Sequence, residues 1–126
     1  MKGIVMIVDD SKTVRASVEY NLSRKNYKVW KANDGQKALE LLEDRKSEGS
    51  KPDMIISDIN MPNMGGIEFI NKLKSKRGFK FIPVLVLTTE SQPAMKEKGK
   101  KAGAAGWLVK PFEPEQLLNV VSKFVK

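Results

Sequence analysis

The sequence predicts an α/β domain in which a doubly wound parallel sheet has helices on both faces. Five short apolar runs alternate along the chain with five stretches whose apolar residues recur at helical spacing. This alternation is typical of parallel sheets, because parallel neighbours must be joined by a crossover long enough to hold a helix. The 126 residues contain no internal repeat and no linker, so we expect a single domain over residues 1–126.

The first predicted strand, residues 4–8, is a β-branched apolar run that ends at two carboxylates, Asp9 and Asp10. Ser11 can cap the helix that follows. The apolar residues of this helix recur at every fourth position, at Val14, Val18 and Leu22. The second strand, residues 27–31, alternates between apolar and polar residues, which favours a place near the sheet edge.

Asp34-Gly35 turns the chain into a second helix, which we expect to fray into the polar stretch 44–51. The third strand, residues 54–56, is apolar at every position and ends at Asp58. A strand that is apolar on both faces belongs in the centre of the sheet. Pro62 and Gly65-Gly66 then mark residues 60–66 as a loop before a third helix.

The fourth strand, residues 82–87, is the most apolar of the chain and ends at Thr88. Pro93 suits the first turn of the next helix, and Gly103 can close that helix. The fifth strand, residues 105–109, ends at Lys110. Pro114 begins a last helix with one apolar face, formed by Leu117, Leu118, Val121, Phe124 and Val125.

Chemically active side chains follow four of the five strands directly. They are Asp9, Asp10, Asp58, Thr88 and Lys110. Because the carboxyl ends of parallel strands meet at one edge, where ligands bind in open α/β sheets, we expect these groups to converge in one cleft. Three clustered carboxylates repel one another unless a cation joins them. Their oxygen atoms suit a hard divalent ion, and Mg²⁺ is the common choice when a phosphate also takes part.

The same cleft has the groups that a phosphoryl transfer needs. Lys110 offers a positive charge and Thr88 a hydrogen-bond donor to phosphoryl oxygens. A carboxylate can itself be the nucleophile and form an aspartyl-phosphate. The chain has no histidine and no cysteine, which excludes histidine catalysis, phosphohistidine and disulfides. The phosphoryl donor must therefore be external.

The motifs around these residues point to a known family. They are Val8-Asp9-Asp10-Ser11, Ser57-Asp58-Ile59-Asn60-Met61-Pro62 with Gly65-Gly66, Leu87-Thr88-Thr89-Glu90, and Lys110-Pro111-Phe112. Together and in this order they resemble the receiver domains of bacterial response regulators, and among them the single-domain chemotaxis (CheY-like) type. The resemblance spans the whole chain. It implies the flavodoxin-like (βα)5 fold with strand order 2-1-3-4-5.

The resemblance also implies a role for each site residue. Asp58 resembles the phosphorylated aspartate. Asp10 resembles a direct Mg²⁺ ligand, Asp9 one that acts through water, and Asn60 one that uses its backbone carbonyl. Lys110 would pair with the phosphoryl oxygens, next to a cis Lys110-Pro111 bond.

Two further roles concern signal readout. Thr88 would move to bond the phosphoryl group and reposition Trp107, at the family's aromatic switch position. Tyrosine or phenylalanine is commoner at that position, so a half-buried anchor and a moving switch both stay open for Trp107. Asn60 and Glu90 occupy positions that tune the lifetime of the phosphoryl group.

The resemblance implies a signalling protein and not a conventional enzyme, although a receiver catalyses its own phosphorylation and dephosphorylation. Its expected partners are a histidine kinase as phosphodonor, the flagellar motor switch or another protein target, and a possible phosphatase. A phosphorelay intermediate or a phosphate sink is the alternative. A phosphatase enzyme is disfavoured because Asn60 stands where a second acid would be needed, and a flavodoxin because Asp9-Asp10 would repel a bound phosphate.

The net charge of +8 raises the question of nucleic acid. The excess lies in residues 69–89, which contain no acidic residue, and in residues 96–101. Aromatic residues do not interleave with these lysines as stacking platforms would, so we expect solvated helix faces and no nucleic-acid binding. No apolar run could span a bilayer. A cytoplasmic monomer is therefore the expectation.

Overall fold

The computed structural model describes residues 2–125. Within them, five parallel strands form a single sheet in the order β2-β1-β3-β4-β5. This confirms the predicted fold class and the central place of the third strand. The elements in chain order are β1 Gly3–Val8, α1 Lys12–Ser23, β2 Tyr27–Ala32, α2 Gly35–Ser47, β3 Met54–Ser57, α3 Gly66–Lys74, β4 Val84–Thr88, α4 Pro93–Ala102, β5 Gly106–Val109 and α5 Pro114–Phe124.

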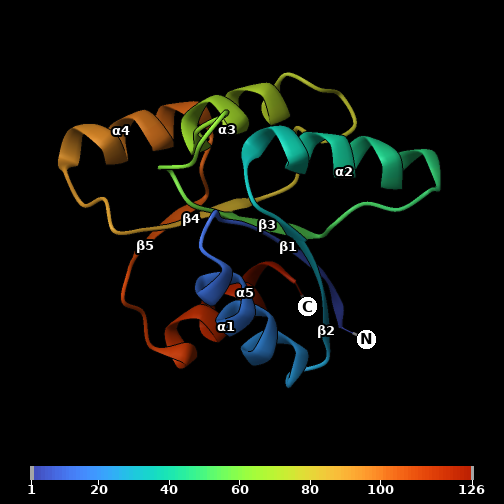
Figure 1. Ribbon diagram of the computed structural model, residues 1–126, viewed down its shortest axis with the longest axis horizontal. Helices are drawn as coiled ribbons and strands as arrows, with labels where there is room; N and C mark the ends of the chain where they lie inside the picture. Colours follow the sequence, from blue (N-terminus) through green and yellow to red (C-terminus); the bar gives the residue numbers. More distant parts are fainter. Residues whose placement is uncertain (1, 126) are drawn as a thin grey trace.

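The helices form two layers. Figure 1 shows α2, α3 and α4 over one face of the sheet and α1 and α5 over the other. Strand β1 contributes to both cores, because Met6 and Val8 pack on the three-helix side while Val5 and Ile7 pack against α1 and α5. All four residues of β3 are buried. The apolar run of the third strand thus marks a strand covered on both faces.

The helix ends follow their sequence signals. The Ser11 hydroxyl accepts a hydrogen bond from the Val14 N–H at 3.2 Å and so caps α1. Helix α4 begins at Pro93, and Gly103 ends it with φ of +113°, a left-handed conformation that glycine adopts without a steric penalty. The Glu113 and Gln116 side chains form a capping box at the start of α5.

The predicted start of the fourth strand is wrong by two residues. Strand β4 begins at Val84 and not at Ile82, because the Ile82 N–H bonds the Phe79 carbonyl in a turn at 3.0 Å. Helix α2 ends at Ser47, within the polar stretch 44–51. Gly49 follows with φ of +83°.

Asp34 fixes the start of α2. Its side chain is buried, accepts a hydrogen bond from the Lys37 N–H at 2.8 Å, and accepts a second from Asn63 Nδ2 at 3.0 Å. The bond from the Lys37 backbone lowers the pKa of Asp34 below 3.8; burial opposes this, and the Asn63 bond adds to it. The ionised carboxylate is therefore the form that the fold stabilises.

We expect Asp34→Ala to lower the free energy of unfolding by about 1 kcal/mol at neutral pH, the usual cost of losing an N-cap. Since the folded-state pKa is depressed, the contribution of Asp34 is present above pH 3.8 and is lost as the pH falls through the lowered value. Urea unfolding at several pH values measures both effects. Asp44→Ala, an exposed site on the same helix, is the matched control. A difference from the wild type that did not shrink in acid would contradict the charged-cap assignment.

Candidate functional site

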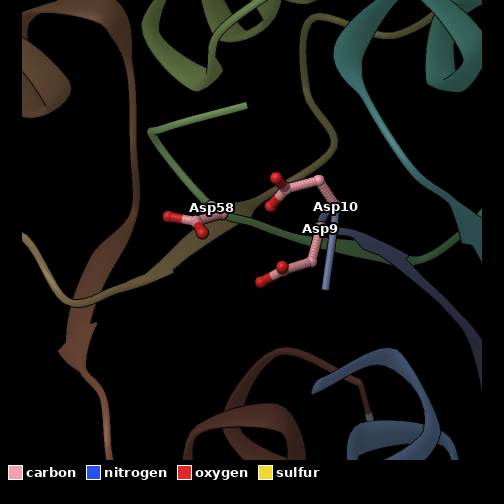
Figure 2. Close-up of side chains that lie close together, drawn as sticks. All are labelled: Asp9, Asp10 and Asp58. Carbon is pink, nitrogen blue, oxygen red and sulfur yellow. The ribbon is translucent and has the colours of Figure 1, made fainter. Parts of the chain in front are cut away.

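Three carboxylates meet at the carboxyl edge of the sheet. Asp9 and Asp10 follow β1 and Asp58 follows β3, and Figure 2 shows their side chains grouped at these neighbouring strand ends. One carboxylate oxygen of each lies within 4.8 Å of those of the other two. Asp9 and Asp58 are buried, whereas Asp10 is exposed.

Lys110 supplies the positive charge of the cluster from the end of β5. Its Nζ lies 2.8 Å from Asp9 Oδ2 and 3.1 Å from Asp58 Oδ2. Burial by itself lowers the pKa of Lys110, but the hydrogen bonds to Asp9 and Asp58 and the charges of both outweigh it, so this pKa lies above its ordinary value of 10.5. The Lys110-Pro111 bond is cis, as the family resemblance implied.

Backbone N–H groups hold the two buried carboxylates in place. The Ile59 N–H donates to Asp58 Oδ1 at 2.6 Å, and the Asn60 N–H lies 3.4 Å from the same oxygen. The Ser11 N–H donates to Asp9 Oδ1 at 2.9 Å. Each carboxylate thus has one oxygen on the backbone and the other on Lys110, which leaves its position well defined.

Thr88 connects the edge of the site to Trp107. Thr88 is fully buried, and its hydroxyl accepts a hydrogen bond from the Glu90 N–H at 3.2 Å. The Glu90 carbonyl in turn accepts one from Trp107 Nε1 at 3.0 Å. The Trp107 ring is half-buried and packs so closely on Gly99 of α4 that a β-carbon there would lie 2.7 Å from it. Trp107 thus contacts both the segment between β4 and α4, through Glu90, and α4 itself, through Gly99.

Comparisons with known proteins agree with this geometry. Residues 5–122 match the response regulator receiver domain family. The chain belongs to this family.

The relatives of this receiver domain differ in length. The solved chemotaxis protein CheY4 of Vibrio cholerae is 43% identical with a TM-score of 0.85, over 97% of this chain and 98% of that one. The chemotaxis protein CheY1 of Helicobacter pylori is 37% identical over 114 residues, 90% of this chain and 89% of that protein. The transcriptional regulatory protein PhoP of Bacillus subtilis is 34% identical over 93% of this chain but only 46% of its own length. The chain therefore spans about half of PhoP.

Receiver domains bind Mg²⁺ at an acidic pocket, and the residues here fit that ion. The cluster offers carboxylate oxygens from three aspartates, the hard ligands that Mg²⁺ prefers. Asp10 takes part in none of the ion pairs recorded for residues 2–125, so its carboxylate is available to a cation. Asn60 is exposed beside this cluster, in the segment that follows Asp58.

The structure brings together the three predicted carboxylates and Lys110. Thr88 lies at its predicted strand end, but its hydroxyl is bonded to Glu90. The sequence did not reveal Arg15, which donates from Nη1 to the Asp9 carbonyl at 2.6 Å. The only signal for it was its place one helical turn after Ser11. The backbone donors of Ser11 and Ile59 were also missed, because a backbone N–H has no signature in a sequence.

We expect Lys110→Met to destabilise the receiver domain by about 2 kcal/mol in Mg²⁺-free buffer. Removing one partner of a buried ion pair commonly costs 3–5 kcal/mol of stability. We expect a smaller cost here because the Lys110 side chain is partly exposed to solvent. Urea unfolding measures the change, with Lys123→Met, an exposed lysine on α5, as the control. Because the pKa of Lys110 is raised, its contribution is full below pH 10.5 and fades only as the pH rises through the raised value. Equal stability of the two variants would contradict a stabilising role for the pairs.

Proposed function

We propose that this receiver domain accepts a phosphoryl group on Asp58 in a Mg²⁺-dependent reaction. The observation that carries the proposal is the position of Lys110 Nζ, 3.1 Å from Asp58 Oδ2, beside three carboxylates at the carboxyl edge of the sheet. A cluster of carboxylates with no positive charge beside it would repel an incoming phosphate. Lys110 offsets part of that repulsion and can bond a phosphoryl oxygen.

In the proposed reaction a carboxylate oxygen of Asp58 attacks the phosphorus of an external donor. The P–O or P–N bond to the donor breaks, and its electron pair leaves with the donor. The nucleophile is a carboxylate and carries no proton that must be removed, so the step needs no general base. The bond from the Ile59 N–H aims the carboxylate, and the Lys110 ammonium can shift from the carboxylates to the transferred group.

Asp10, Asp58 and the Asn60 carbonyl would hold Mg²⁺, with Asp9 acting through water. The bound ion supplies charge neutralisation of the phosphoryl oxygens. Asp9 is fully buried whereas Asp10 is exposed, so of these two neighbours Asp10 is the easier one for a hydrated ion to reach directly.

The Thr88–Glu90–Trp107 chain offers a route from the site to the surface. If the Thr88 hydroxyl turns to donate to the phosphoryl group, the Glu90 N–H loses its acceptor, and the Glu90 carbonyl that holds the Trp107 indole is free to move. Trp107 would then act as a switch whose rest position is the anchored one. Asn60 follows Asp58 by two residues, and Glu90 follows Thr88 by two. In this proposal both side chains tune the lifetime of the phosphoryl group.

For the cellular role we propose chemotaxis, with a histidine kinase as donor and the flagellar motor switch as target. The similarity to CheY4 and CheY1 over most of both chains supports this role. A cytoplasmic monomer is part of the same proposal. No helix in residues 2–125 is long and apolar enough to cross a membrane. A phosphorelay intermediate or phosphate sink is the alternative, and transfer of the phosphoryl group to a histidine phosphotransfer protein would favour it over direct binding to a motor switch protein.

Acetyl phosphate with Mg²⁺ tests the chemistry directly. Intact mass spectrometry should show one added phosphoryl group that hydroxylamine removes, because an acyl phosphate is labile to that nucleophile and a serine phosphate is not. EDTA should prevent labelling. Beryllofluoride with Mg²⁺ should change tryptophan fluorescence in the wild type but not in Trp107→Phe, in which buried Trp30 is the only tryptophan left. Hydroxylamine-stable labelling, or labelling without Mg²⁺, would overturn the proposal.

A further inference from the structure

An exposed aromatic ring lies at the edge of the sheet opposite the aspartate cluster. Phe81, in the segment between α3 and β4, is 86% exposed, whereas Phe79 two residues earlier is fully buried. The segment precedes β4, so it lies at the amino ends of the strands, whereas Asp58 follows β3 and Thr88 is the last residue of β4 (Figure 1). A single exposed ring is common on protein surfaces, so Phe81 becomes informative only together with the groups that surround it.

The backbone around Phe81 is ordered by internal bonds. Lys74 Nζ donates to the Lys80 carbonyl at 3.1 Å and to the Ile82 carbonyl at 2.6 Å, on either side of Phe81. The Ile82 N–H bonds the Phe79 carbonyl at 3.0 Å. Burial lowers the pKa of Lys74, as expected for an ammonium packed against the chain. Phe81 is thus presented on a preorganised turn, which reduces the entropy cost of binding.

A hollow of about 260 Å³ adjoins the ring. Pro52, Ile82 and Pro83 give it apolar walls, and Lys51 and Arg77 lie on its rim. Its one acidic lining residue, Asp53, has Oδ2 bonded to the Ile4 N–H at 2.8 Å. We call Phe81, this hollow and the adjacent Lys80 the Phe81 surface.

The Phe81 surface has unbalanced positive charge. Lys80 Nζ lies 5.2 Å from the centroid of the Phe81 ring. Among residues 2–125, Lys51, Arg77 and Lys80 take part in none of the recorded ion pairs. Residues 69–89 contain no acidic residue that could balance them. Phe69 and Phe79 are buried and Phe81 alone of the three is exposed, so this stretch presents no series of stacking platforms.

We propose that the Phe81 surface docks an acidic polypeptide segment that carries an apolar side chain. The apolar side chain would enter the hollow beside Phe81, and flanking carboxylates would pair with Lys51, Arg77 and Lys80. An apolar centre with a charged rim is the usual anatomy of a protein interface, and the complementary charges give register and speed of association.

The Phe81 surface fits single-stranded nucleic acid or an anionic membrane less well than it fits an acidic peptide. Single-stranded nucleic acid stacks successive bases on several aromatic side chains, and the Phe81 surface presents one. A membrane surface needs a broader apolar face than one ring for stable attachment.

This docking is independent of the proposed phosphorylation, because the two sites lie at opposite ends of the strands. A partner held there would stay bound whether or not Asp58 is modified. The Phe81 surface would therefore keep the receiver domain near a partner, separately from the switched output.

The test uses a short fluorescein-labelled peptide with a central pair of leucines flanked by runs of glutamate. We expect saturable binding by fluorescence anisotropy, and amide shifts in ¹⁵N NMR confined to residues 51–53 and 76–83. Phe81→Ser and Lys80→Glu should each weaken binding about tenfold or more, equal to about 1.4 kcal/mol. Lys98→Glu makes the same charge change on exposed α4 and should have much less effect. Beryllofluoride with Mg²⁺ should leave the affinity unchanged.

Peptides with glutamine for glutamate, or serine for leucine, should bind at least several-fold more weakly. Absence of saturable binding, or equal losses in Lys98→Glu and Lys80→Glu, would overturn the proposal. So would Phe81-dependent binding to phosphatidylglycerol vesicles or to an oligonucleotide in place of the peptide. Phe81→Ser should still be phosphorylated by acetyl phosphate, so failure here is distinguishable from failure of the Asp58 assignment.

Discussion

Asp58→Asn is expected to abolish phosphorylation by acetyl phosphate and to leave the fold intact. An amide is not a nucleophile toward phosphorus at neutral pH, whereas the carboxylate is. The side-chain oxygen of asparagine can still accept the bond that Asp58 Oδ1 receives from the Ile59 N–H at 2.6 Å. Intact mass with acetyl phosphate and Mg²⁺ measures the first effect, and far-UV circular dichroism the second.

The same variant should bind Mg²⁺ about tenfold more weakly or worse, because removing even an outer partner of a metal site costs 10–100-fold. The wild type should gain thermal stability as Mg²⁺ is added, and Asp58→Asn should gain less. Asp44→Asn makes the same charge change on exposed α2 and should match the wild type in both assays. A full phosphoryl adduct on Asp58→Asn would show that another residue is the acceptor.

Much of the fold could be predicted from the sequence, because apolar periodicity is a local property that the final structure keeps. The third strand illustrates this: residues 54–56 are apolar at every position, and β3 lies in the centre of the sheet with all its residues buried. The site followed from one rule of parallel sheets, since Asp9, Asp10, Asp58 and Lys110 each follow a strand and the carboxyl ends share one edge.

The features that were missed depend on geometry that composition does not encode. Which oxygen of Asp9 bonds Lys110, and which bonds the Ser11 N–H, is set by how β1 and β5 lie across the sheet. The exposure of Phe81 beside buried Phe79 depends on the turn that Lys74 closes. The predicted start of β4 was wrong for the same reason, because the Ile82 N–H belongs to that turn and not to the strand.

The second large effect is expected at Gly66, the first residue of α3. A β-carbon there would overlap the Asp58 carbonyl oxygen and lie 2.8 Å from the Ile59 α-carbon, a distance that real β-carbons essentially never show. The obstructing atoms are backbone, which cannot turn away as a flexible side chain would. The Gly66 N–H also donates to the Ile59 carbonyl at 2.8 Å, so the helix start cannot retreat without losing that bond.

Gly66→Ala should therefore lower the free energy of unfolding by about 2–3 kcal/mol, in the range of overpacked core sites. Gly65→Ala is the matched control, since a β-carbon there meets only the Ile59 carbonyl oxygen, at 3.1 Å. Urea unfolding compares the two, and equal stabilities would contradict the close approach. Because the clash falls on the Asp58 backbone, whose carboxylate must stay within reach of Lys110, Gly66→Ala should also slow labelling by acetyl phosphate under conditions in which the variant is fully folded. The absence of a β-carbon at Gly66 is thus required by the position of the Asp58 backbone as much as by the helix that begins there.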